Sequence, residues 1–92
     1  MKTGGFFMKQ FNYTIKDELG LHARPAGLLV KKTGSFKSNI QITKNDKSAD
    51  GKRILGIMSL GIKQNDEITV TVEGEDENEA ALELKEFFKN NL

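Results

Sequence analysis

The chain contains one histidine, His22, whose neighbours could form a binding site for an anion. It lies in the stretch GLHARPA, residues 20–26. Pro25 has no amide hydrogen to donate, so it suits the first turn of a helix, where amides lack partners in any case, and His22 then lies near the N-cap. The unpaired amides, the positive end of the helix dipole and the guanidinium of Arg24 would all attract a negative charge. We therefore expect an anion site at this helix start.

An imidazole in this position could act as a nucleophile. The positive helix end favours its neutral form, which leaves a ring nitrogen free near neutral pH. A phosphoryl group accepted by His22 would be stabilised by the surrounding donors, each charge-assisted hydrogen bond contributing about 1.5–3 kcal/mol. Because proline is common at helix starts, an ordinary surface histidine explains the same residues equally well. We expect no metal or cofactor, since one histidine and no cysteine supply fewer ligands than a zinc site requires.

The composition indicates one globular domain. The 92 residues are 37% hydrophobic and 29% charged, which is typical of a compact fold rather than a disordered chain. The 14 Lys and Arg nearly balance the 13 Asp and Glu, so we expect no binding to nucleic acid. No apolar run reaches the roughly 20 residues of a membrane helix, so we expect no membrane insertion. Because no signal peptide is recognisable and cysteine is absent, we expect a cytoplasmic protein. Residues 1–7 share no pattern with the rest, and we interpret them as an extension or a cloning remnant before a single domain over residues 8–92.

Alternation of apolar and polar residues predicts four strands. Two are clear, over residues 9–15 and residues 68–72, where every second side chain is apolar. A third strand contains Ile40 and Ile42, and the polar Asn45-Asp46 pair is suited to a turn into a short fourth strand at residues 47–49.

Helical spacing predicts three helices. The first runs from His22 to Gly34, a glycine suited to the C′ position. Residues 53–60 could form a buried strand or a short helix, and we favour the helix because Gly61 suits its C′ position and a clear strand follows. The last helix starts at Asp76, which we expect to pair with Glu79 in a capping box. Its apolar stripe consists of Ala80, Ala81, Leu84, Phe87 and Phe88.

The order of these elements is strand, helix, strand, strand, helix, strand, helix. Four strands with one apolar face need a cover, and three amphipathic helices supply it. The predicted fold class is therefore α+β, an open-faced β-sandwich (βαββαβα) with a four-stranded antiparallel sheet covered on one face by three helices.

Two motifs in this order closely resemble the HPr family, the histidine-containing phosphocarriers of the bacterial phosphoenolpyruvate-dependent sugar phosphotransferase system (PTS). GLHARPA is followed about thirty residues later by KRILGIMSLGI, and the resemblance covers essentially residues 8–92. It implies an HPr-like fold and a carrier, not an enzyme: His22 accepts phosphate on Nδ1 from the phosphohistidine of enzyme I and passes it to a histidine of a sugar-specific IIA protein. Arg24 would stabilise the phosphoryl group, and Pro25 with the first helix amides would set the geometry.

The resemblance also implies a docking surface for enzyme I and IIA proteins. Because five apolar residues around about two helical turns exceed what one buried face needs, some should be exposed. Of this run, we expect Ile57 and Leu60 to face inward. We also expect a monomer, since a carrier must expose both His22 and the patch. The apolar patch that the resemblance implies consists of Gly20, Leu21, Ile54, Leu55 and Met58.

Arg53 departs from the family pattern. In HPr proteins of Gram-positive bacteria a serine at the matching position is the target of a regulatory kinase, so we expect that switch to be absent here. Arginine also lacks the hydroxyl of a good N-cap and places a cation at the positive helix end, which Asp50 could partly offset. Two alternatives stay open: a regulatory HPr paralogue that acts by binding partners, and a nitrogen-type phosphorelay protein.

Overall fold

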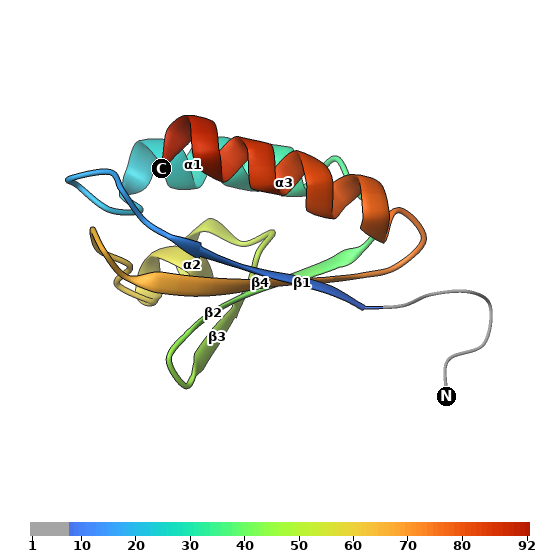
Figure 1. Ribbon diagram of the computed structural model, residues 1–92, viewed down its shortest axis with the longest axis horizontal. Coiled ribbons are helices and arrows are strands. Elements are labelled where there is room, and N and C mark those ends of the chain that lie inside the picture. Colours follow the sequence, from blue (N-terminus) through green and yellow to red (C-terminus); the bar gives the residue numbers. More distant parts are fainter. Residues whose placement is uncertain (1–7) are drawn as a thin grey trace.

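The computed structural model describes residues 8–92 and has the predicted order of elements (Figure 1). The interpretation of residues 1–7 as an extension lies outside the described residues. The strands and helices are β1 (Lys9–Thr14), α1 (Ala23–Thr33), β2 (Asn39–Lys44), β3 (Lys47–Asp50), α2 (Ile54–Ser59), β4 (Glu67–Glu73) and α3 (Glu77–Asn91).

The four strands form one antiparallel sheet in the order β1-β4-β2-β3. Val70 in the central strand β4 lies opposite Phe11 on one side and Ile42 on the other, and all three side chains are buried. On the other face polar side chains bond across the strands, as Thr69 Oγ1 does to Asn12 Oδ1 at 2.8 Å. The sheet therefore has one apolar and one polar face, as the alternation predicted.

The helices cover the apolar face of the sheet. Figure 1 shows α1 and α3 lying side by side along it. Phe88 of α3 packs edge-on against Phe11 of β1, with ring centroids 6.2 Å apart. At the end of α3, Leu92 is buried, and its main-chain oxygen accepts hydrogen bonds from the backbone N–H groups of Lys16 (2.5 Å) and Asp17 (2.8 Å). The loop after β1 is thus tied to the end of α3.

Two helix ends were predicted from glycines, and only one has the expected geometry. Gly61 follows α2 with φ +61°, the left-handed conformation that suits a C′ glycine. Gly34 ends α1 with φ −65°, an ordinary helical value, so that helix stops without a left-handed residue. The turn at Asn45, φ +56°, joins β2 to β3 as predicted.

The predicted capping box at α3 is wrong. Asp76 is the N-cap, but its side chain makes no capping bond. Instead it accepts hydrogen bonds from the connection between α1 and β2. The donors are the backbone N–H of Lys37 (2.8 Å) and the N–H (2.9 Å) and hydroxyl (2.5 Å) of Ser38. The cap-like bond comes from Glu77, whose Oε1 accepts from the N–H of Gly74 at 3.0 Å.

No helix within residues 8–92 is long and apolar enough to cross a bilayer. Nor does the described part of the chain bring together three or more metal-ligating side chains.

Candidate functional site

His22 is the N-cap residue of α1, as predicted. Its backbone is extended (φ −92°, ψ −173°), its side chain is partly exposed, and that side chain makes no capping bond. The first helical hydrogen bond runs from the N–H of Ala26 to the carbonyl of His22 at 3.0 Å. Within the described chain the amides of Ala23 and Arg24 donate no hydrogen bond, and Pro25 has none to donate. Two free N–H groups therefore lie at the helix start beside His22.

One pocket of about 230 Å³ contains the predicted site residues. His22, Arg24 and Pro25 all line it. Its other lining residues are Asp17 from the loop after β1, Leu28 from α1 and Asn91 from the end of α3. The positions of Asp17 and Asn91 in the sequence carry no signal that places them at this pocket, because the fold brings the loop after β1 and the end of α3 to the start of α1.

The loop before His22 is fixed against the segment that follows α2. Gly20 has φ +67°, and a Cβ there would lie 2.5 Å from the carbonyl oxygen of Ile62 and 2.7 Å from Cα of Lys63. The N–H of Leu21 donates to the same Ile62 carbonyl at 3.1 Å. This close backbone contact requires glycine, and it holds the approach to α1 in place.

Two of the five residues predicted for the apolar patch, Gly20 and Leu21, are buried in the structure. Leu21 is 5% exposed and belongs to the core, and Gly20 is buried, because the turn at Gly20 directs this segment inward. These two residues offer no side chain to a partner.

The exposed apolar residues of α2 remain from the docking surface that the sequence predicts, and for this reason we call them the docking patch: Ile54, Leu55 and Met58, which are 37%, 80% and 39% exposed. As predicted, Ile57 and Leu60 face inward, with 0% and 7% exposure.

The docking patch adjoins α1. A Cβ on Gly27 of α1 would lie 3.9 Å from Cδ1 of Ile54, which shows how closely the two helices approach. On α1, Leu28 is an exposed apolar residue that also lines the His22 pocket. Sequence analysis missed Leu28, although an apolar residue next to the buried Leu29 was a detectable sign that this helix carries more than one apolar face.

Arg53 is the N-cap of α2 and makes no side-chain capping bond. Its Nε lies 3.7 Å from Oδ2 of Asp50, the partner expected from the sequence. Both side chains are more than half exposed, so this ion pair contributes little to stability.

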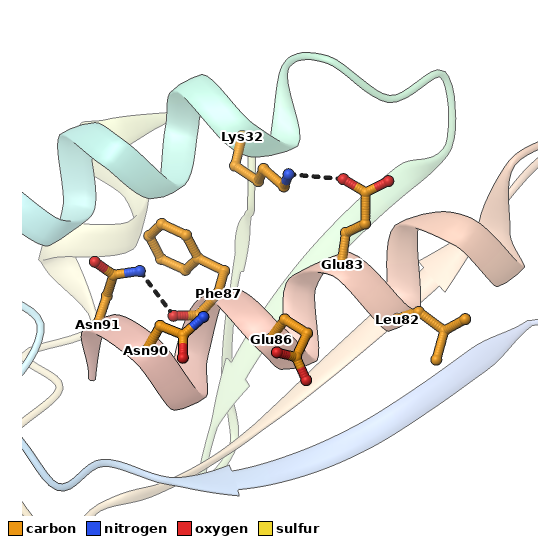
Figure 2. Close-up of a pocket in the computed structure, with 7 residues that line it drawn as sticks. All are labelled: Lys32, Leu82, Glu83, Glu86, Phe87, Asn90 and Asn91. Atoms are coloured by element: carbon orange, nitrogen blue, oxygen red, sulfur yellow. Dashed lines mark hydrogen bonds and ion pairs between the residues drawn. The ribbon is translucent and has the colours of Figure 1, made fainter.

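A roomier pocket of about 360 Å³ lies between α1 and α3, apart from His22 (Figure 2). Lys32 and Glu83 form an ion pair of 2.6 Å across it, and Phe87 forms part of its wall. It contains neither a histidine nor another strong nucleophile, so its size does not make it the site of phosphoryl chemistry. Its lining residues are Lys32, Leu82, Glu83, Glu86, Phe87, Asn90 and Asn91.

Comparison with known proteins identifies the family. The family model described as "PTS HPr component phosphorylation site" matches residues 9–90. The phosphocarrier protein HPr of Lysinibacillus sphaericus is 48% identical over 73 residues, which are 79% of this chain and 83% of that protein. HPr of Mycoplasma genitalium is 40% identical over 85 residues, 91% of this chain and 97% of that protein. The crystal structure of HPr from Bacillus anthracis has a TM-score of 0.83 at 40% identity and covers 88% of this chain and 96% of its own.

Of the functions that the sequence left open, these similarities support the phosphocarrier. The chain belongs to the HPr family and is a phosphocarrier of the bacterial phosphotransferase system, a phosphoryl-transfer intermediate rather than an enzyme in its own right.

Proposed function

We propose that His22 carries the phosphoryl group, on Nδ1. The observation that supports this most strongly is its N-cap position, where the amides of Ala23 and Arg24 have no partner in the described chain. Arg24 lines the same pocket as His22. An added phosphoryl group would thus meet a cation and free N–H donors, the groups that bind phosphate at helix starts.

The transfer conserves protons. The neutral ring of His22 holds its proton on Nε2 and attacks phosphorus with the lone pair of Nδ1. As the new P–N bond forms, the P–N bond of the donor phosphohistidine breaks, and its electron pair returns to the donor ring. Onward transfer repeats the step: the acceptor histidine attacks, the P–Nδ1 bond breaks, and His22 regains its lone pair.

The neighbouring groups have separate tasks in this proposal. Arg24 and the free amides balance the charge of the phosphoryl oxygens. Pro25, with its fixed φ, holds the first turn of α1 so that these amides stay directed at His22. Because Arg24 is exposed, it can follow the phosphoryl group without binding it so tightly that transfer stops.

For partners, we propose enzyme I as the donor and IIA proteins of sugar uptake as acceptors, in the cytoplasm, as family membership implies. The docking patch, with 80% exposure at Leu55, is the surface that supports this. Methionine at position 58 suits partners of different shape, because its side chain is flexible. The protein would act as a monomer, which leaves both His22 and the docking patch open.

At Arg53 we propose that the regulatory switch of Gram-positive HPr proteins is missing. The side chain at the start of α2 is a guanidinium, which has no hydroxyl for a kinase to phosphorylate.

The test is phosphotransfer with the purified chain, phosphoenolpyruvate, magnesium and a cognate enzyme I, followed by intact mass. We expect one added phosphate that is lost in acid, as phosphohistidine is, and none in His22→Ala. Arg24→Ala should still be phosphorylated, but more slowly. An unphosphorylated wild-type chain, or a phosphate that persists in His22→Ala, would contradict the proposal.

A further inference from the structure

Asp17 shares the pocket of the proposed phosphoryl acceptor. It lines the same space of about 230 Å³ as His22 and Arg24, although it belongs to the loop after β1. Asp17 and Arg24 are the two lining residues that carry a full charge, one of each sign. A phosphoryl group on His22 would therefore have a carboxylate as well as a guanidinium for a neighbour.

Hydrogen bonds hold Asp17 in this position. Its N–H donates to the main-chain oxygen of Leu92 at 2.8 Å, and its carbonyl accepts from the N–H of Gly20 at 2.9 Å. Its Oδ1 accepts from the N–H of Leu19 at 2.8 Å. The side chain is partly buried, and it forms no ion pair with any described residue. The carboxylate is thus held in place by hydrogen bonds and has no ion-pair partner among the described residues.

We infer that the carboxylate of Asp17 makes the phosphoryl group on His22 easier to transfer. This inference rests on the proposed function of His22. A phosphoryl group brings a charge of about −1.5 to −2 near neutral pH, and the fixed carboxylate repels it. Arg24 and the free amides of α1 favour the phosphorylated form, and Asp17 opposes them, so that the group is held but stays reactive.

Among the described residues that line the pocket, Asp17 is the only acidic one, and its charged neighbours in the loop lie outside the pocket. Lys16 and Glu18, which flank Asp17 in the same loop, are exposed and do not line the pocket, and α3 contributes the uncharged Asn91. Glu18 therefore offers a matched control, since its removal changes the net charge by the same amount at a neighbouring place.

Asp17→Asn is the sharpest variant, because its amide oxygen can still accept the bond from Leu19 while the charge is gone. The protein is phosphorylated with enzyme I, the enzyme is removed, and the lifetime of the phosphohistidine is followed at fixed pH. In this hydrolysis water attacks phosphorus, the P–Nδ1 bond breaks and inorganic phosphate leaves. We expect Asp17→Asn to lengthen the half-life roughly three- to tenfold, and Glu18→Gln to change it less than twofold.

Salt separates an electrostatic role from a structural one. Because ions screen charges over about 10 Å at 0.1 M, the ratio of the two half-lives should shrink towards one as salt is raised. Asp17→Ser, which also keeps an acceptor for Leu19, should behave like Asp17→Asn and serves if the first variant does not fold. An unchanged or shorter half-life, an equal effect of Glu18→Gln, or a ratio independent of salt would overturn the inference. Absence of phosphate on the wild-type chain would instead overturn the proposed function.

Discussion

The N–H of Leu21 donates a hydrogen bond of 3.1 Å to the carbonyl of Ile62, so the residue before His22 is fixed to the segment after α2. Two parts of the surface that are far apart in the sequence thereby share one rigid support. The pocket that His22 lines lies at the start of α1, and the docking patch lies on α2. A partner that binds the docking patch would consequently find His22 at a constant position.

Gly20 should be essential to this support. In Gly20→Ala the new Cβ would lie 2.5 Å from the Ile62 carbonyl oxygen, and the backbone has φ +67°. Gly61→Ala is the matched control, because Gly61 has φ +61° but no described atom within 4 Å of its Cβ position. We expect Gly61→Ala to lower the free energy of unfolding by about 1–2 kcal/mol, and Gly20→Ala to lower it further and to slow phosphorylation. Urea unfolding and phosphotransfer rates measure both, and equal losses in the two variants would show that the close contact has no cost.

Alanine substitutions at Leu55 and Ile57 should affect different properties, partner binding at Leu55 and the stability of the fold at Ile57. Leu55 is 80% exposed and Ile57 is fully buried in the same short helix. Leu55→Ala should change the free energy of unfolding by less than about 0.5 kcal/mol but reduce transfer to or from a partner protein at least about threefold. Ile57→Ala should cost about 2–5 kcal/mol, because it leaves a cavity in the core. If Leu55→Ala transferred phosphate at the wild-type rate, the docking patch would have been placed on the wrong residues.

Much of the fold was predictable because local patterns and tertiary packing agree. In β4 the apolar residues Ile68, Val70 and Val72 alternate with polar ones, and all three face the core. The inward positions of Ile57 in α2 and of Leu60 at its C-cap followed from helical spacing. The periodicity of apolar residues marks the face of each strand and helix that is buried, and in this fold all these faces pack into one core.

The sequence did not predict the positions of residues that depend on backbone geometry or on contacts with distant parts of the chain. The place of His22 at the start of α1 was predictable from one local motif, but Asp17 and Asn91 reach the pocket only through the packing of the β1 loop and α3. Leu21 was expected to belong to the docking surface, and the left-handed turn at Gly20 directs it into the core instead. Asp76 was expected to cap its own helix, yet it binds Ser38, which is 38 residues away. No local pattern encodes such a choice between acceptable partners.

Arg53→Ser should stabilise the protein. The arginine at the N-cap of α2 makes no capping bond, whereas a serine hydroxyl could accept from a free amide of the first turn. We expect a gain of about 1 kcal/mol in the free energy of unfolding, since the exposed ion pair lost with Asp50 contributes little. Arg53→Ala is the control, because it removes the same charge without adding a hydroxyl. Equal stability of the serine and alanine variants would show that the cap is not formed.

The pH dependence of stability should reveal the role of Asp76. Hydrogen bonds from the Ser38 hydroxyl and then from the Lys37 N–H lower the pKa of its carboxyl below the ordinary 3.8. A group whose pKa is depressed by folding stabilises the protein above its unfolded pKa, and this contribution is lost as the pH falls through the lower, folded value. The contribution of Asp76 should therefore be complete near neutral pH and disappear at pH values below 3.8.

Asp76→Asn isolates this effect, because the amide can still accept a hydrogen bond but does not titrate in this range. The wild-type chain should be the more stable near neutral pH, and its advantage should shrink as the solution is made more acidic than about pH 4. Asp66, whose pKa is lowered mainly by its bond to Lys44, titrates in the same direction, but it is present in both chains and cancels in the difference. Urea unfolding of both chains across this range is the measurement. A difference in stability that stays constant with pH would mean that the charge of Asp76 does not contribute, and that only the geometry of its bonds to Ser38 matters.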